Sequence, residues 1–86
     1  MDNDKCYKTH NFYLAAFLYA KGLELIDVDK TEFKKSYFVF AINPELELLL
    51  RVFNFGTEEA PEARIDARKL IYAIKKLKDS LYEQNY

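Results

Sequence analysis

The most apolar stretch of this chain is FYLAAFLYA, residues 12–20, which contains no charged side chain. Because its only polar groups are tyrosine hydroxyls, a helix formed here has to be covered from several directions. Thr9 and Asn11 each offer a side-chain oxygen to the first free backbone amides, and Gly22 supplies the left-handed position that often ends a helix. The pattern therefore predicts a central helix over residues 12–21, against which the rest of the chain packs.

Two segments of alternating character follow, and they predict an antiparallel β-hairpin. Residues 23–29 and 36–42 are rich in β-branched and aromatic side chains, and a polar turn joins them. In the second strand Phe38 and Phe40 share one face, because successive side chains alternate. We expect helices to cover that face. The opposite face of the hairpin then carries five apolar side chains, Leu23, Leu25, Tyr37, Val39 and Ala41, and the pattern does not say what covers them.

The second half of the chain predicts two more helices. Asn43 and Pro44 form a strong helix start, and Gly56 ends that helix, which gives residues 44–55. Asp66 is placed to cap a long last helix over residues 67–83. The apolar stripes expected from helical spacing are Leu46, Leu48, Leu49, Leu50, Val52, Phe53 and Phe55 in the first helix, and Ala67, Leu70, Ile71, Ile74, Leu77 and Leu81 in the second.

The order of these elements predicts one small α+β domain over residues 1–86: a helix, an antiparallel two-stranded hairpin, and two helices packed with it. A short third strand over residues 63–65 is left open as an addition to the sheet. We expect residues 1–8 to be a frayed terminus, and the acidic, proline-containing segment 57–64 to be a mobile loop.

Composition supports a folded domain. Half of the residues are hydrophobic and 16% are aromatic, which favours a packed core over disorder. The formal net charge of −1 provides no overall field that attracts polyanions. The single cysteine, Cys6, excludes an internal disulfide and fits a reducing compartment. The acidic start of the chain does not look like a signal peptide, and the apolar run is shorter than the roughly 20 residues that cross a bilayer. The prediction is a cytoplasmic protein without membrane contact.

The solvent-facing side of the last helix is the best candidate for a nucleic-acid-binding surface. Its residues are Arg68, Lys69, Tyr72, Lys75 and Lys76, with Arg64 just ahead of the helix. Cations bind phosphates and an aromatic ring stacks a base, which together make a nucleic-acid interface. The alternative is an ordinary solvated face whose cations pair with Asp79 and Glu83. Residues 62–86 hold six Lys/Arg against four Asp/Glu, so any such binding is expected to be weak and sensitive to salt.

Metal and catalytic sites are not predicted. Asp27, Asp29 and Glu32 are oxygen donors, but the segment lacks the glycine and the spacing of a calcium loop. Cys6 and His10 are the only cysteine and histidine in the sequence, whereas a structural zinc needs four ligands, so only a dimer could complete such a site. Two glycines are too few for a phosphate-binding loop, and no nucleophile motif is present. We therefore expect no catalytic residue, no cofactor and no enzymatic activity.

Several short motifs in the chain resemble a known family. They are Thr9-His10-Asn11 before Tyr13-Leu14-Ala15-Ala16, then Lys21-Gly22, Phe38-Val39-Phe40, Asn54-Phe55-Gly56, and Ile65-Asp66-Ala67-Arg68 ahead of Leu77-Lys78. In these the chain resembles a group of short proteins catalogued only as a domain of unknown function, found in bacteria, archaea, phages and other mobile elements. The loop between Gly56 and Ile65 is longer here than in that group. The resemblance implies the helix–hairpin–helix–helix order and an origin in a mobile element. It implies no activity.

Two functions remain open at this point. The leading hypothesis is a non-enzymatic module that docks onto another protein or onto a second copy of itself through the open hairpin face. The alternative is a weak nucleic-acid-binding accessory protein that uses the basic face of the last helix.

Overall fold

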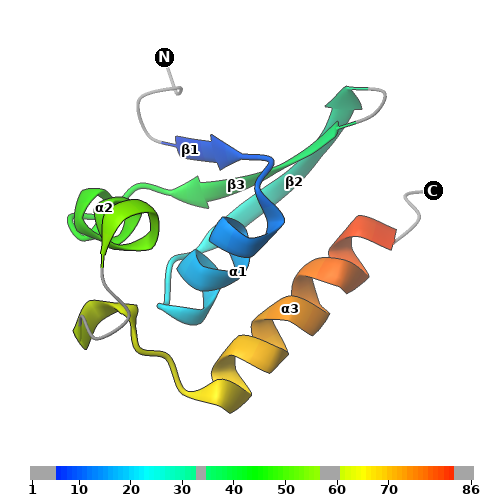
Figure 1. The fold of residues 1–86 in the computed structure, drawn as a ribbon. Coiled ribbons are helices and arrows are strands. Elements are labelled where there is room, and N and C mark those ends of the chain that lie inside the picture. Colours follow the sequence, from blue (N-terminus) through cyan, green and yellow to red (C-terminus); the bar gives the residue numbers. More distant parts are fainter. Residues whose placement is uncertain (1–5, 33–34, 57–60, 83–86) are drawn as a thin grey trace.

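The computed structural model describes residues 6–32, 35–56 and 61–82. In chain order its elements are β1 (Cys6–Thr9), α1 (Phe12–Ala20), β2 (Leu25–Glu32), β3 (Lys35–Ala41), α2 (Leu46–Phe55), the 3-10 turn η2 (Pro61–Ala63) and α3 (Ala67–Tyr82) (Figure 1). The described residues thus form three α-helices and a three-stranded antiparallel sheet, which confirms the predicted α+β class.

Helix α1 begins at the asparagine that the sequence offered as a cap. The side-chain oxygen of Asn11 accepts the backbone N–H groups of Tyr13 and Leu14, both at 3.1 Å. Thr9 is not the cap, because its hydroxyl accepts the N–H of Asn11 instead, also at 3.1 Å. Gly22 follows the helix with a φ of 103°, a conformation that favours glycine. The prediction of a helix at residues 12–21 is therefore confirmed to within one residue.

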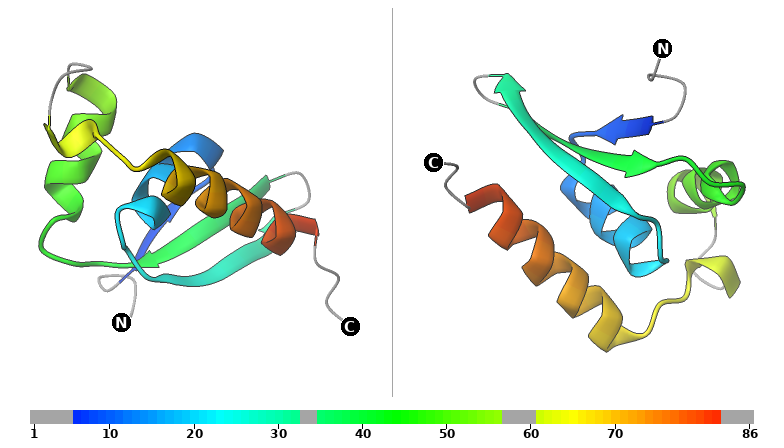
Figure 2. Two further views of the ribbon diagram at one scale, coloured as in Figure 1. Left: turned by 90° about the horizontal axis from the view of Figure 1, so that it is seen from below. Right: turned by 180° about the vertical axis from the view of Figure 1, so that it is seen from behind.

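Helix α1 is the centre of the domain. Figures 1 and 2 show it lying between the sheet on one side and α3 on the other, with α2 near one end. Residues 14–18 are consecutive and each is at most 7% exposed. Five consecutive helical residues point in every direction around the axis, so the helix is enclosed on all sides over residues 14–18. Phe38 and Phe40 press on it from the sheet and are 2% and 0% exposed.

Strand β1 was not expected from the sequence. It pairs antiparallel with β3, where Lys8 lies opposite Val39 and Thr9 lies opposite Phe38, so β3 becomes the central strand. Residues 6–8 are therefore part of an edge strand rather than a frayed end, while residues 1–5 lie outside the described residues. Four residues are too few to show a clear alternation. Thr9 is inward-facing and buried.

The option of a third strand at residues 63–65 is wrong. Residues 61–63 form the 3-10 turn η2, and no strand follows before α3. Mobility predicted for residues 57–64 falls partly on residues 57–60, which lie outside the described residues. The remaining part has a defined local hydrogen bond, because the N–H of Arg64 donates to the carbonyl of Pro61 at 3.1 Å.

The predicted hairpin is present as β2 and β3, but β2 contains a bulge. The register with β3 shifts by one residue between Leu25 and Asp27, which makes Ile26 the extra residue. Ile26 is 50% exposed, whereas Leu25 and Val28 both pack on the core. Strict alternation had placed Leu25 on the face of the hairpin opposite to Phe38 and Phe40. That expectation is wrong, because the bulge at Ile26 lets Leu25 lie opposite Phe40 on the inner face.

Helix α2 begins two residues later than predicted. The side-chain oxygen of Asn43 accepts the N–H of Glu45 at 2.9 Å, so the asparagine forms a turn that leads into the helix. At the other end, the N–H of Gly56 donates to the carbonyl of Val52 at 2.8 Å. A Cβ on Gly56 would lie 2.6 Å from that carbonyl oxygen, so the glycine is required for space.

Helix α2 buries its apolar residues on one side and leaves others exposed. Leu46 and Leu49 are 7% and 4% exposed, with Leu50, Val52 and Phe53 partly buried against the core. Leu48 and Phe55 were expected to widen the buried stripe, but they are 47% and 83% exposed. The helix sits at the end of the sheet, where α1 and η2 reach only one side of it (Figure 1).

Helix α3 is capped as predicted and is slightly rotated from the predicted orientation. The carboxylate of Asp66 accepts the N–H of Arg68 at 2.8 Å. The most buried residues are Ala73 and Leu77, both 0% exposed, whereas Ile71 is 55% exposed and Ala67 is also exposed. The inward-facing side of α3 is therefore centred on Ala73 and Leu77, and Ile71 lies outside it.

Candidate functional site

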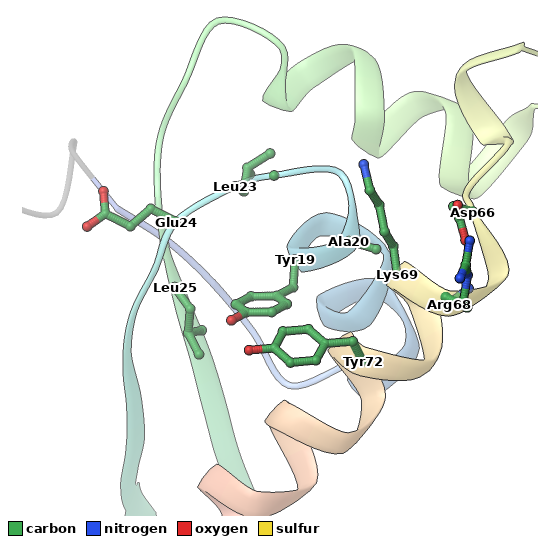
Figure 3. A pocket seen from close by; sticks show the side chains of 10 residues that line it. Tyr19, Ala20, Leu23, Glu24, Leu25, Asp66, Arg68, Lys69 and Tyr72 are labelled. Carbon is green, nitrogen blue, oxygen red and sulfur yellow. The ribbon is translucent and has the colours of Figure 1, made fainter.

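A hollow lies between α1, the start of β2 and the first half of α3. Its volume is about 860 Å³. We call it the α1–α3 cleft; it is shown in Figure 3. Its lining residues are Tyr19, Ala20, Gly22, Leu23, Glu24, Leu25, Asp66, Arg68, Lys69 and Tyr72.

Two tyrosines from different helices stack in this cleft. The rings of Tyr19 on α1 and Tyr72 on α3 have centroids 6.4 Å apart and an interplanar angle of 24°. This separation lies within the range of interacting aromatic pairs. Tyr19 is partly buried against the core, while Tyr72 is 57% exposed. Figure 3 shows both hydroxyls pointing to the same side of the cleft, toward Leu25.

The charged groups of the cleft lie mainly at its α3 side. Lys69 extends alongside Ala20, while Arg68 lies close to Asp66, and Glu24 points away from the tyrosines (Figure 3). Helix α3 as a whole contains five Lys and Arg residues and one Asp. The solvent side of this helix is therefore positively charged, although the chain carries a formal net charge of −1.

The lysine that follows α1 as its C-cap connects the segment before α3 to the core. The ammonium group of Lys21 donates to the carbonyl of Arg64 at 2.9 Å, and it lies 5.9 Å from the centre of the Phe17 ring. This contact fixes the position from which α3, and with it the cleft, begins.

The residues singled out on the last helix are all exposed, as predicted: Arg64, Arg68, Lys69, Tyr72, Lys75 and Lys76. The cleft brings Arg68, Lys69 and Tyr72 together. Lys76 lines a second hollow of about 500 Å³ farther along α3, together with Asp79, Ser80 and Tyr82. Tyr19 was missed. Its position in the central helix indicated only a core residue, and nothing in the sequence places it beside Tyr72.

A comparison with protein-family models matches residues 4–83 to a domain of unknown function, DUF5659. The chain belongs to the DUF5659 family. The matched range includes every helix and strand described above. No curated protein and no solved structure matches the chain. Membership confirms the resemblance to an uncharacterised family but assigns a role to no residue, so any function has to be argued from the geometry of the domain.

The apolar face predicted as a protein interface is divided in this DUF5659 domain. Leu23 is 4% exposed and Leu25 is partly buried, and both pack in the core beneath the sheet. Tyr37, Val39 and Ala41 lie on the other side of the sheet, where Val39 is only 6% exposed. The five residues do not form one patch, because the bulge at Ile26 turns Leu25 inward.

A charged side chain covers the outer face of the sheet. Lys8 in β1 and Asp29 in β2 lie on the two edge strands, with β3 between them. The Lys8 ammonium donates to the Asp29 carboxylate at 3.2 Å. The aliphatic stem of Lys8 therefore crosses over β3 beside Val39, its partner in the register. This contributes to the burial of Val39, whose other register partner is Asp27, on a face over which no described helix lies (Figures 1 and 2).

Asp29 is held in its ionised form by local hydrogen bonds. Its carboxylate accepts the N–H of Thr31 at 3.0 Å and the hydroxyl of Thr31 at 2.7 Å. These bonds, followed by the bond from Lys8, lower the pKa of Asp29 to about 2. At the neighbouring position, the ring of Tyr37 meets that of His10 edge to face, with centroids 5.6 Å apart. The outer face thus carries a polar network beside Tyr37 and Val39.

The metal donors considered from the sequence do not gather in the described residues of the DUF5659 domain. Among residues 6–32, 35–56 and 61–82, no three His, Cys, Asp or Glu side chains lie close enough to hold one ion. Cys6 is a free thiol. In the same part of the chain, no helix is long and apolar enough to cross a membrane.

Proposed function

We propose that this domain is a small, cytoplasmic, non-enzymatic module that binds nucleic acid through the α1–α3 cleft and the basic face of α3. The observation that carries the proposal is that Arg68, Lys69 and Tyr72 line one cleft together with the stacked Tyr19. Cations at such a site displace the counterions of phosphates, and exposed aromatic rings accept bases. An origin in a phage or another mobile element, which the resemblance implies, belongs to the same proposal, and gene neighbourhood tests it.

The charge distribution favours weak binding at one face only. The five cations of α3 are set against one acid in that helix, while the rest of the chain is acidic. With two or three phosphate contacts, the logarithm of the binding constant should fall with the logarithm of salt concentration with a slope of about −2 for a single strand.

The test is fluorescence anisotropy with a labelled oligothymidylate of about 12 nucleotides at low salt. The double variant Arg68→Gln/Lys69→Gln should bind at least about fivefold more weakly, with a salt slope reduced by about 1.4, because two phosphate contacts are lost. The matched control is Lys35→Gln/Arg51→Gln, which removes the same charge from exposed residues of β3 and α2. The control should stay within about twofold of the parent. Absence of binding at about 50 µM protein, or equal losses in both variants, contradicts the proposal.

Self-association is a second candidate function, and the outer stripe of α2 favours it. Leu48 and Phe55 are 47% and 83% exposed, with Val52 between them at helical spacing. Leu48 and Phe55 lie at equal distances from the middle of this stripe. An antiparallel second copy would therefore place Leu48 of each copy against Phe55 of the other, which is the symmetry of a two-fold dimer.

The dependence on salt concentration distinguishes nucleic-acid binding from self-association. Arg51 is exposed next to the middle of the α2 stripe, so the two copies would bring like charges together. Added salt should then strengthen self-association, whereas it weakens nucleic-acid binding. Sedimentation velocity over a range of concentrations should show a dimer that Phe55→Ser abolishes, with Ile42→Ser as the control at another exposed apolar residue. A monomer at every concentration removes this candidate.

A further inference from the structure

We infer that Tyr72, backed by Tyr19, forms a platform on which one unpaired base stacks, so that the domain prefers single strands to duplexes. The inference rests on the proposed function and names the feature of nucleic acid that the site recognises. Tyr72 is 57% exposed even though its ring stacks on Tyr19. The ring is held at the wall of the cleft and is still open to solvent. Any base can stack on its exposed face, because every base has a π-face.

Tyr19 supplies the rigidity that such a platform needs. It is partly buried against the core cluster and follows Leu18, which is 0% exposed. Its backbone is therefore fixed by the most enclosed element of the domain. Stacking on this fixed ring restrains Tyr72 before any ligand arrives, which lowers the entropy lost on binding.

The cations of α3 lie where the neighbouring phosphates would be. Arg68 precedes Tyr72 by four residues and Lys76 follows it by four, so each is about 6 Å away along the helix axis. Arg68 lines the cleft, and Lys76 lines the next hollow along the same helix. The span from Arg68 to Lys76 is about 12 Å, which is the length of three to four stacked nucleotides at about 3.4 Å each. A strand running along α3 would place one base at Tyr72.

A duplex offers no base to this platform. Its bases are paired and stacked inside, so it reaches only the cations of α3, through its phosphates. The difference between single-strand and duplex affinity therefore measures the contribution of Tyr72. A purely structural role of the tyrosine pair, which joins α3 to α1, predicts no such difference.

The chain contains no tryptophan, so one substitution creates a unique fluorescent probe. In the variant Tyr72→Trp, titration with oligothymidylate should quench the indole emission in parallel with the anisotropy of the labelled strand. The matched control is Tyr13→Trp, at a tyrosine of α1 that is 72% exposed and lines a different groove. Its emission should not change. An oligomer of the same length made only of abasic sites should bind without quenching the Tyr72→Trp variant.

Affinities of ring variants complete the test. Tyr72→Leu should weaken single-strand binding by about five- to a hundredfold, because one stacked base is lost. The same change should leave duplex binding within about twofold, and Tyr72→Phe should leave both ligands within about twofold, because the ring remains. Circular dichroism and the melting temperature show that each variant is folded.

The possible failures are distinguishable. If the abasic and normal strands bind equally and Tyr72→Trp shows no quenching, the platform is overturned while the proposed function stands. An equal effect of Tyr72→Leu on single strand and duplex also overturns the platform. If no oligonucleotide binds the parent protein, the proposed function fails and the platform fails with it.

Discussion

The two faces of the sheet reach similar burial by different means. On the inner face Phe38 and Phe40 lie against α1 and are 2% and 0% exposed. On the outer face Val39 is 6% exposed, yet its cover is the stem of Lys8, whose charge pairs with Asp29. A small exposed fraction therefore does not by itself identify a core residue. What matters is whether the covering atoms belong to packed apolar side chains or to one long polar side chain.

Apolar packing on the inner face and the Lys8–Asp29 pair on the outer face should contribute differently to the free energy of unfolding. Apolar contact on the inner face stabilises the fold by about 25 cal/mol for each Å² removed from water. The ion pair on the outer face joins a Lys8 side chain that is 53% exposed to an Asp29 side chain that is 22% exposed. Exposed pairs of this kind contribute at most about 1 kcal/mol.

The largest effect is expected from Phe40→Ala on the inner face. Phe40 is fully buried in the central strand, so the change leaves a cavity against α1. We expect a loss of about 3–5 kcal/mol in the free energy of unfolding, measured by urea denaturation followed by circular dichroism. Since small domains have about 5–15 kcal/mol in total, the variant should be close to unfolding. A loss below about 1.5 kcal/mol would mean that the inner face is not the core.

A smaller effect is expected from substitutions of Lys8 on the outer face. Two variants distinguish the contribution of its aliphatic stem to stability from that of its charge. Lys8→Met keeps an unbranched stem over Val39 and removes the ion pair, so the loss should be under about 0.5 kcal/mol. Lys8→Ala also uncovers Val39, and the loss should reach about 1 kcal/mol. Both are measured as for Phe40→Ala. Equal values for the two variants would show that the stem of Lys8 does not cover Val39.

Local signals predicted most of the elements. Asn11 and Asp66 are caps that act on amides two or three residues away, so the starts of α1 and α3 could be predicted from short stretches of sequence. The charge-free run of residues 12–20 identified the central helix, because a helix without a polar face has to be buried at the centre of a small domain.

The features that were missed depend on contacts between distant segments. The bulge at Ile26 and the pairing of β1 with β3 are set by the partner strand, and neither leaves a mark in the local pattern. The same holds for the candidate site. The exposed cations and Tyr72 could be predicted from helical spacing, whereas their assembly with Tyr19 depends on how α3 crosses α1.

The smallest effect concerns the titration of Asp29 on the outer face. Its pKa in the folded protein is about 2, below its ordinary value of 3.8, because the backbone N–H and the hydroxyl of Thr31 and then Lys8 donate to the carboxylate. A lowered folded pKa stabilises the protein above the ordinary value, and that contribution is lost as the pH falls from about 4 to about 2.

Two variants test the side-chain donors to Asp29. Thr31→Ala and Lys8→Met should each raise the pKa of Asp29, because the Thr31 hydroxyl and then Lys8 donate to the carboxylate. Both variants should leave the pKa below its ordinary value, since the backbone N–H of Thr31 still donates. NMR titration of the Asp29 carboxyl carbon measures this, with Lys35→Met as a control that removes a lysine not bonded to Asp29. An unchanged pKa in both variants would mean that neither the Thr31 hydroxyl nor Lys8 helps to hold Asp29 ionised.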